Sequence, residues 1–321
     1  MRVLVTGANG IIGTRFCTHL KRAGHHVTAA VRSAERARGV DADAFAMVGD
    51  LADYAGWPAA LTGMDAVVHL AARVHQMQEP VADPLPLYLR ANTQVTEALA
   101  QAALAAGVQR FVYISTAQVN GLNSGERPMR EDDPPKLPTP YAVSKWQAEQ
   151  SVWRLLRGRV EAVVLRPPLV YAPRAVGNLL RLMRLVERGW PLPFASITAK
   201  RSLVGLDNLA DALTQCVTHP RAAGQTFFVT DGEDLPVPQI IRLIAAGLQR
   251  PARLLPFPPA LLMALARIAG VQEQMTRLCG GMQVDSSSIR NTLDWRPSRS
   301  PQESIREMTD WYRSSRAGSG A

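Results

Sequence analysis

Cysteine is scarce in this sequence, and the cysteines that are present do not pair. Cys17, Cys216 and Cys279 lie far apart, with no repeated spacing. Disulfide frameworks and thiolate metal sites need paired cysteines, so neither is expected here. No group of histidines and carboxylates has the spacing of metal ligands. We therefore expect no metal ion and a reducing, cytoplasmic location.

Long apolar runs are absent as well. No run reaches the roughly 20 apolar residues that a membrane-spanning helix needs. The first residues lead directly into a strand-like segment instead of a signal-peptide core, so we expect no insertion into a membrane. The longest apolar stretch, Pro259 to Val271, has the pattern of a buried or half-buried helix. Docking of this helix on a membrane surface is the alternative.

The second half of the chain is poor in acidic residues. Lys and Arg balance Asp and Glu over residues 1–150, so the whole formal net charge of +9 lies in residues 151–321. A basic half of this kind suits an anionic ligand such as a nucleotide diphosphate. The basic residues form no dense run with aromatic residues between them, which argues against a nucleic-acid partner.

Short apolar runs alternate with helix-like stretches in the first half, which is typical of a doubly wound parallel sheet. Strands are predicted at 2–6, 27–31, 44–48, 66–70, 110–115, 160–165 and 225–229. Helices are predicted at 11–23, 93–106, 140–156, 178–188 and 238–248. We expect an α/β protein with a Rossmann-type core over residues 1–170. A smaller α/β substrate lobe would follow over 171–312, with some crossing of the chain back to the core. Residues 313–321 would form a flexible tail.

A glycine-rich segment, Thr6-Gly7-Ala8-Asn9-Gly10-Ile11-Ile12-Gly13, lies between the first predicted strand and the first predicted helix. In dinucleotide-binding proteins the first such glycine permits a tight turn and the second lets backbone amides approach the pyrophosphate. The third allows the helix to pack closely on the strand, and the helix N-terminus presents free N–H groups to the phosphates. The segment therefore predicts an NAD(P) site.

The end of the second strand lacks the acidic residue that binds the ribose in Rossmann proteins that use NAD. Val31 and Arg32 stand there instead, so nothing repels a 2′-phosphate and Arg32 can pair with one. This favours NADP(H), with NAD(H) as the alternative. Asp50 and Leu51 follow the third strand and are expected to contact the adenine.

Tyr141 and Lys145 lie four residues apart in a predicted helix, so both project from one face of it. A tyrosine with a pKa of about 10 is a poor proton donor or acceptor at neutral pH. A nearby ammonium group favours the phenolate and lowers that pKa, which fits the tyrosine for acid–base catalysis. The pair follows the strand that ends at Ser115 and Thr116 by one loop, as in an active site.

With these features in place, the sequence resembles the extended short-chain dehydrogenase/reductase family, also called the NAD-dependent epimerase/dehydratase family. The likeness extends over nearly the whole chain in the order of the family's motifs. The matching segments are the glycine motif at 6–13, Gly49-Asp50-Leu51, His69-Leu70-Ala71-Ala72, Asn92, Ile114-Ser115-Thr116-Ala117, Tyr141 with Lys145, Arg166-Pro167-Pro168-Leu169-Val170-Tyr171, Arg201 with Asn208-Leu209-Ala210-Asp211, and Leu293-Asp294-Trp295-Arg296-Pro297.

The resemblance implies a role for each candidate catalytic residue. Thr116 would hydrogen-bond the reacting oxygen of a sugar, with Ser115 as the alternative. Tyr141 would exchange the proton, and Lys145 would tune it and hold the nicotinamide ribose. A cofactor held rigidly beside an oriented substrate makes hydride transfer efficient.

The resemblance also implies which residues bind ligands. The cofactor would be contacted by Gly7, Asn9, Gly10, Ile11, Ile12, Gly13, Arg32, Asp50, Leu51, Leu70, Ala71, Ala72, Tyr141, Lys145 and Pro167. The nucleotide diphosphate of a UDP-sugar would be contacted by Asn178, Arg201 and, more weakly supported, Arg277. A homodimer through the Tyr141 helix and the helix before it is implied as well.

Within the family, the likeness is to UDP-hexose 4-epimerases and to bacterial 4-keto reductases that make UDP-N-acetylquinovosamine-type sugars. Three departures from the epimerase pattern favour the reductase. No acid follows the second strand, Gln118-Val119-Asn120-Gly121 lacks the usual tyrosine, and Arg166-Pro167-Pro168-Leu169 lacks a substrate-contacting asparagine. A noncatalytic NADP-sensing module is disfavoured because Tyr141 and Lys145 are intact. A flavonoid- or steroid-type reductase is disfavoured by the basic second half.

Overall fold

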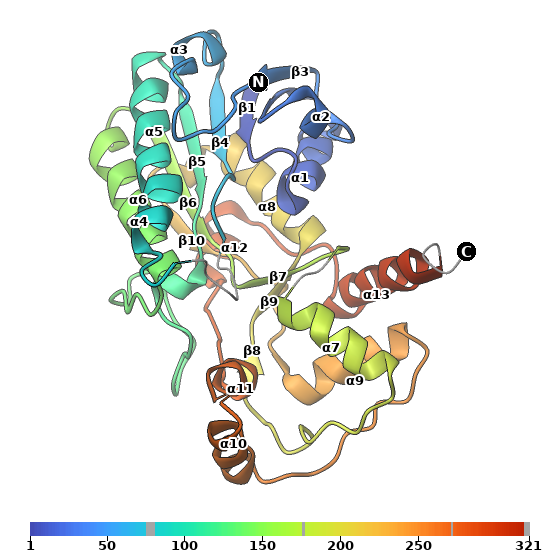
Figure 1. The fold of residues 1–321 in the computed structure, drawn as a ribbon. Coiled ribbons are helices and arrows are strands. Elements are labelled where there is room, and N and C mark those ends of the chain that lie inside the picture. The colour runs from blue at the N-terminus through green and yellow to red at the C-terminus, as the bar shows by residue number, and fades with distance from the viewer. Residues whose placement is uncertain (75–80, 175–176, 271, 318–321) are drawn as a thin grey trace.

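The chain folds around one seven-stranded parallel sheet in the order β10-β6-β5-β4-β1-β2-β3 (Figure 1). The structure is a computed structural model that describes residues 1–74, 81–174, 177–270 and 272–317. The strands are β1 (Arg2–Thr6), β2 (His26–Val31), β3 (Ala44–Met47), β4 (Ala66–His69), β5 (Arg110–Ile114), β6 (Glu161–Arg166) and β10 (Thr226–Phe228). This order confirms the predicted Rossmann-type α/β fold, and the strand order reverses between β1 and β4.

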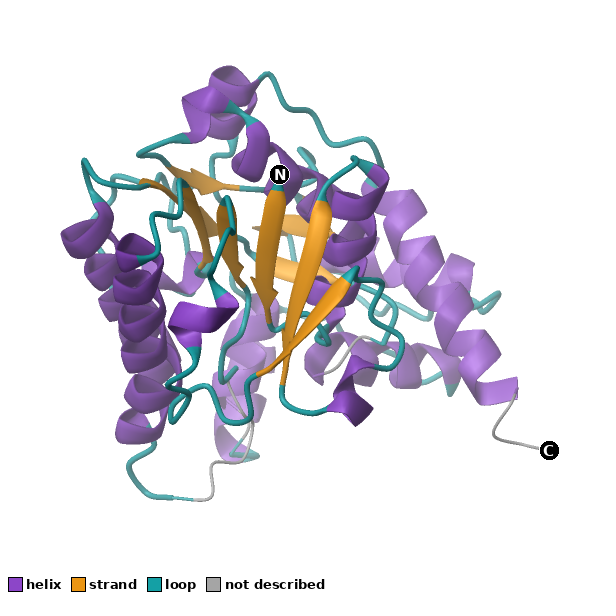
Figure 2. Cartoon of the chain, turned by 90° about the horizontal axis from the view of Figure 1, so that it is seen from above, coloured by secondary structure: helices purple, strands orange, loops and turns teal. Residues whose placement is uncertain are grey.

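Helices cover both faces of the sheet, which explains why its central strands are continuous apolar runs (Figure 2). Successive side chains of a strand point to opposite faces. Val3 therefore packs with Phe16 on one face, whereas Leu4 packs with Leu99 and Val152 on the other. The helices of this half are α1 (Ile11–Arg22), α2 (Ala34–Ala37), α3 (Trp57–Ala60), α4 (Leu85–Tyr88), α5 (Val95–Ala105) and α6 (Pro140–Leu156), with a π-helical turn η1 (Leu89–Gln94) and a 3-10 turn η2 (Ala117–Val119).

The N-terminus of α6 is built as its sequence predicts. Thr139 lies just before the helix in an extended conformation, and its hydroxyl accepts a hydrogen bond from the amide of Ala142 (3.1 Å). Pro140 occupies the first helical position, where the missing N–H costs nothing. This cap fixes where the helix begins, and Tyr141 follows in its first turn.

Most of the chain after residue 170 forms a second layer below the sheet (Figure 1). The remaining elements of the chain, some of which return to the sheet, are β7 (Leu169–Tyr171), α7 (Gly177–Glu187), β8 (Lys200–Arg201), β9 (Leu203–Gly205), α8 (Leu206–Thr218), a 3-10 turn η3 (Pro220–Ala222), β11 (Leu235–Pro236), α9 (Val237–Gly247), α10 (Pro259–Ile268), α11 (Gln272–Cys279), α12 (Ser287–Leu293) and α13 (Pro301–Ala317). Met183, Ile241 and Met308 anchor a separate apolar core between α7, α9 and α13.

Part of this second half returns to the sheet. β10 pairs with β6, and Leu213 of α8 and Ile289 of α12 pack in the same core as Val3. The crossing was expected, but α8, α12 and the short strands were not located from the sequence. A domain boundary at residue 170 stays a prediction.

The C-terminal helix is longer than the sequence suggested. A tail was expected from residue 313, but α13 continues to Ala317 because Met308 and Tyr312 are buried along one face of it. Residues 318–321 lie outside the described part. Within the described ranges, no helix is both long and apolar enough to cross a membrane.

Candidate functional site

The predicted site segments meet at the carboxyl edge of the parallel sheet. The glycine loop follows β1, Arg32 follows β2, Asp50 follows β3, and Leu70-Ala71-Ala72 follows β4. Ser115 and Thr116 follow β5, and Pro167 follows β6. In open parallel sheets this edge, next to the point where the strand order reverses, is where ligands bind.

The glycine loop leaves no room for larger side chains. Gly7 has a φ of +67°, and a Cβ there would lie 2.7 Å from the amide nitrogen of Ala71. A Cβ on Gly13 would overlap the carbonyl oxygen of Gly7 and lie 2.7 Å from the Cα of Ala8. Gly10, which precedes α1, is exposed and donates to the Gly7 carbonyl oxygen (3.0 Å). The loop therefore packs tightly against the sheet while its outer backbone stays open to a ligand.

Side chains around this loop are arranged as a dinucleotide site requires. Asn9, Ile11 and Arg32 are exposed, as is Asp50, whose carboxylate accepts from the Ala52 amide (3.1 Å). Ile12, Leu51, Leu70, Ala71 and Ala72 are half-buried. Arg32 has no acidic neighbour in the sequence from Val27 to Ala34. The residues fit an anionic dinucleotide laid across the loop.

Ser115 and Thr116 lie together where β5 ends. The Ser115 amide donates to the Leu165 carbonyl oxygen (2.7 Å), but the buried Ser115 hydroxyl has no hydrogen-bond partner within the described structure. The Thr116 hydroxyl accepts from the Gln118 amide (3.3 Å) and caps η2. Pro167 is buried, and its carbonyl oxygen accepts from the Ala117 amide (2.9 Å), which joins the β5 and β6 loops.

Lys145 follows Tyr141 by about one turn of α6 and is buried. Its side chain is 1% exposed, and Nζ donates to the Ile114 carbonyl oxygen (2.5 Å) and lies 4.2 Å from the ring centroid of Tyr113. Burial lowers the pKa of Lys145 to about 7, although the nearby carboxylate of Glu149 opposes that shift.

The pKa of Tyr141 shifts in the direction opposite to the one expected. Burial and then the neighbouring Tyr88, whose ring centroid is 6.2 Å away, raise it to about 12. The Nζ of Lys145, one turn further along α6, donates to the Ile114 carbonyl oxygen at the end of β5. With this pKa, Tyr141 is a protonated phenol at neutral pH.

A chain of buried hydrogen bonds connects the glycine loop with the Tyr141 helix. Thr6 contacts Nδ1 of His69 (2.6 Å), and Nε2 of His69 contacts Thr96 (3.0 Å). Thr96 donates to the Asn92 carbonyl oxygen (2.6 Å). The hydroxyl of Thr96 therefore accepts from Nε2–H of His69, and Nδ1 accepts from Thr6. Burial, followed by the charge of Lys145, lowers the pKa of His69 to about 3, so the ring is neutral.

Asn92 completes this chain. Its side-chain oxygen accepts from the Arg73 amide (2.7 Å), and its Nδ2 donates to the Arg73 carbonyl oxygen (3.1 Å) and to Ser144 Oγ (2.9 Å). Ser144 in turn donates to the Tyr141 carbonyl oxygen (2.8 Å). Asn92 lies in the π-helical turn η1, a feature that is often found at functional sites.

A second buried contact supports the same helix. Arg166 of β6 donates two hydrogen bonds to the carboxylate of Glu149 (3.0 and 2.6 Å) and one to Asn120 (3.1 Å). Glu149 is fully buried one turn after Lys145. Neither Ser144 nor Glu149 was selected from the sequence, where only their position on the Tyr141 helix could have identified them.

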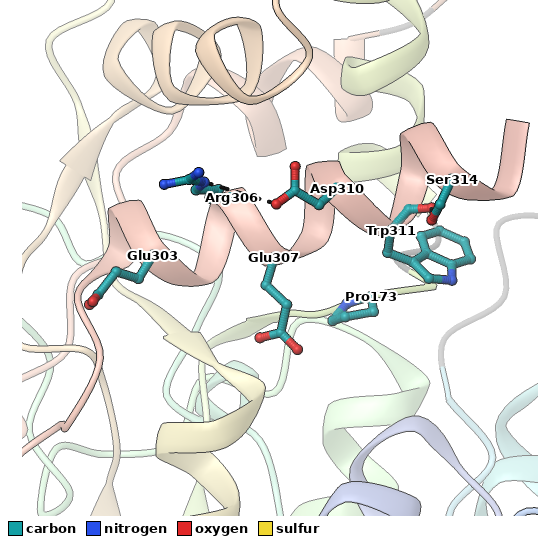
Figure 3. Close-up of a pocket in the computed structure, with 7 residues that line it drawn as sticks. All are labelled: Pro173, Glu303, Arg306, Glu307, Asp310, Trp311 and Ser314. Atoms are coloured by element: carbon teal, nitrogen blue, oxygen red, sulfur yellow. Dashed lines mark hydrogen bonds and ion pairs between the residues drawn. The ribbon is translucent and has the colours of Figure 1, made fainter. Parts of the chain in front are cut away.

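The predicted substrate contacts are less well defined. Arg201 lies on β8, where Nη1 donates to the Gly280 carbonyl oxygen (3.0 Å) and burial lowers its pKa. Asn178 and Arg277 lie in α7 and α11, but their side chains are outside the described residues. An open groove of about 680 Å³ on α13 is lined by Pro173, Trp311 and polar residues of that helix, and by none of the predicted site residues (Figure 3).

The chain is similar to known proteins over nearly its whole length. The model of the NAD dependent epimerase/dehydratase family matches residues 3–229. The chain is 37% identical over 314 residues to a UDP-glucose 4-epimerase of Vibrio cholerae, with 97% of this chain and 95% of the relative covered. It is 31% identical to a 2-alkyl-3-oxoalkanoate reductase of Stenotrophomonas maltophilia, with 78% and 77% covered.

Among solved structures, the fold is similar to that of MoeE5 in complex with UDP-glucose and NAD. The TM-score is 0.75 at 25% sequence identity, and 98% of this chain and 99% of that chain are covered.

Proposed function

The chain belongs to the NAD dependent epimerase/dehydratase family, and from this premise we propose that it is a UDP-hexose 4-epimerase. The observation that carries the proposal is the hydrogen bond from Lys145 Nζ to the Ile114 carbonyl oxygen, which holds the helix of Tyr141 at the end of β5, where Thr116 follows. The relative from Vibrio cholerae supports the choice of epimerase, because its likeness extends over both lobes. This choice reverses the preference for a reductase that the sequence alone gave.

The residues of the site fit a nicotinamide dinucleotide. The glycine loop is a cradle that a Cβ would fill, and Ser115 has a buried hydroxyl without a partner in the described structure. Gly7, Gly10 and Gly13 would hold the pyrophosphate, Asp50 and Leu51 the adenine, and Leu70 to Ala72, Pro167 and Lys145 the nicotinamide half. When bound, the nicotinamide ring supplies the acceptor and donor of hydride for the sugar carbon.

The chain's own residues handle the proton. Thr116, or Ser115 beside it, hydrogen-bonds the C4 oxygen of the sugar, and Tyr141 takes the proton of that hydroxyl when C4 is oxidised. Tyr141 returns the proton when C4 is reduced from the opposite face of the 4-keto sugar. Because the raised pKa keeps the phenol protonated at neutral pH, the base role requires positive charge nearby, and Lys145 is placed to contribute it from one helical turn away.

A UDP-4-keto-6-deoxy-N-acetylhexosamine reductase is the second candidate. Leu169, the last residue of Arg166-Pro167-Pro168-Leu169, stands where an epimerase carries its substrate-contacting asparagine. A protonated Tyr141 is also the form that donates to a ketone oxygen in a one-way reduction. In either reaction Arg201, Asn178 and Arg277 are proposed to contact the UDP group. A cytoplasmic homodimer also stays a prediction.

Which cofactor the protein binds depends on which of the two reactions it catalyses. Epimerisation uses NAD(H) that stays bound, whereas the exposed Arg32 after Val31 favours NADP(H). The nucleotide that co-purifies with the protein identifies which one is held. If Arg32 binds a 2′-phosphate, Arg32→Ala should weaken NADP(H) binding and leave NAD(H) binding nearly unchanged.

The deciding experiment supplies purified protein with UDP-glucose or UDP-N-acetylglucosamine and NAD⁺, and resolves the products by chromatography and proton NMR. We expect the matching 4-epimers to form. If they do not, and NADPH is consumed only with a UDP-4-keto-6-deoxy-N-acetylhexosamine, the reductase is the correct assignment. Absence of turnover with all of these UDP-sugars would overturn both.

A further inference from the structure

The lower end of the molecule carries large apolar side chains that are exposed in the part of the chain that the structure describes. On α10 the exposed fractions are 50% for Leu261, 49% for Leu265 and 84% for Ile268. These residues follow the i, i+4, i+7 spacing of one helix face. Leu262 and Ala266 hold the helix to the rest of the lobe from a neighbouring face. Figure 1 shows α10 at the bottom of the view, distant from the seven-stranded sheet.

Two paired segments that precede α10 in the chain expose further large apolar side chains. The Leu192 amide donates to the Arg253 carbonyl oxygen (2.8 Å), and the Leu255 amide donates to the Leu192 carbonyl oxygen (2.9 Å). Leu255 is 51% exposed, and Trp190, two residues before Leu192, is 58% exposed. We call Trp190, Leu255, Leu261, Leu265 and Ile268 together the apolar end of the lobe.

The segments that form the apolar end carry charge of a single sign. Residues 188–206 and 235–272 contain no Asp or Glu. Exposed cations include Arg188 directly after α7, Arg253 in one of the paired segments and Arg267 on α10. A second copy of the same surface would bring these arginines against one another. An anionic surface would neutralise them.

We propose that the apolar end docks the protein on an anionic lipid bilayer, with α10 lying in the plane of the headgroups. Leucine and isoleucine enter the acyl boundary, a tryptophan sits at the level of the headgroups, and arginines bind lipid phosphates. α10 has ten residues, which is too short to span a bilayer but sufficient to lie on one. The attachment is peripheral and depends on salt.

The test is co-sedimentation of the full chain with vesicles of phosphatidylcholine alone or mixed with phosphatidylglycerol, at low and high salt. The protein should pellet with the mixed vesicles at low salt, and not with phosphatidylcholine alone. Leu265→Glu with Ile268→Glu should lower the partition coefficient at least tenfold. Arg253→Ala with Arg267→Ala should lower it by about tenfold or more, because each arginine near an anionic surface strengthens binding severalfold.

The matched controls make the same types of substitution elsewhere on the surface. Phe45→Glu places a charge at another exposed apolar position, and Arg159→Ala with Arg221→Ala removes two exposed arginines. Both should pellet like the wild type, and all variants should keep the wild-type thermal midpoint. Equal binding to both vesicle types, binding to neither, or equal losses in the controls would overturn the proposal. Conversion of a dimer to a monomer by Leu265→Glu with Ile268→Glu would assign the face to a second copy instead.

Discussion

Nδ2 of Asn92 donates a hydrogen bond to Oγ of Ser144 over 2.9 Å and thereby joins the π-helical turn η1 to the helix that carries Tyr141. Both side chains are buried, and Ser144 passes the contact on to the Tyr141 carbonyl oxygen. The position of the phenol therefore depends on a residue from a different helical segment.

Replacing Asn92 tests this dependence. Asn92→Ala leaves the Arg73 amide without its acceptor, so we expect the free energy of unfolding to fall by about 1–3 kcal/mol. Turnover should fall more than KM changes, because a displaced Tyr141 loses alignment with the sugar oxygen. Chemical denaturation and steady-state kinetics measure both effects. Glu97→Gln is the control, because the Glu97 carboxylate of α5 contacts Ser151 (3.3 Å) and Arg154 (2.8 Å) in the last turns of α6, far from Tyr141. A KM effect with unchanged kcat would contradict the positioning role.

Removing the Tyr141 hydroxyl tests the proton transfer itself. Tyr141→Phe should lower kcat by about 10²–10⁴-fold, the range typical of general acid–base groups, while the dissociation constant for the nicotinamide cofactor stays close to that of the wild type. Tyr88→Phe is the matched control. It removes the hydroxyl of the neighbouring ring, which donates to the Val74 carbonyl oxygen (3.2 Å) in the wild type. An unchanged rate in Tyr141→Phe would remove this residue from the chemistry.

Substitutions at two glycines of the loop should separate an effect on folding from an effect on nucleotide binding. In Gly13→Ala the new Cβ meets the backbone of Gly7 and Ala8, which cannot move away, so we expect destabilisation of about 1–3 kcal/mol or more. In Gly10→Ala the Cβ is 3.2 Å from the Gly7 carbonyl oxygen at a φ of −76°, which a larger residue adopts easily. That variant should fold normally but bind the cofactor more weakly. Thermal unfolding and isothermal titration distinguish the two outcomes. Equal stability of both variants would contradict the packing role of Gly13.

Much of this architecture follows from local sequence signals, because strands buried on both faces and capped helices leave strong patterns. β1, α1 and α6 begin at the predicted residues for that reason. The contacts of Asn92, Ser144 and Glu149 did not follow from the sequence, since each depends on a partner from another element. The pKa of Tyr141 was predicted in the wrong direction. The spacing of Tyr141 and Lys145 shows that they share a helix face, but not that the ammonium is directed to Ile114.

The buried Lys145 should make stability depend on pH in the cofactor-free protein. Its pKa is about 7 in the folded state, against an ordinary value of 10.5. Between these two values the unfolded chain binds a proton that the folded chain does not, so this residue makes stability rise with pH across that window. Below pH 7 both states are protonated, and its destabilising effect is complete.

Lys145→Met removes the titrating group while it keeps most of the apolar stem. The wild type should therefore gain stability relative to Lys145→Met as the pH rises from about 7 toward 10. Urea unfolding of both proteins across this range measures the difference between their free energies of unfolding. The contributions of groups that titrate in both proteins cancel in this difference. His69, which is neutral in the folded state, acts only at lower pH, because its contribution changes between pH 6.5 and about 3. A difference that stays constant from pH 7 to 10 would mean that Lys145 keeps its proton in the folded protein. The ammonium would then be available to stabilise a Tyr141 phenolate at neutral pH without help from a ligand.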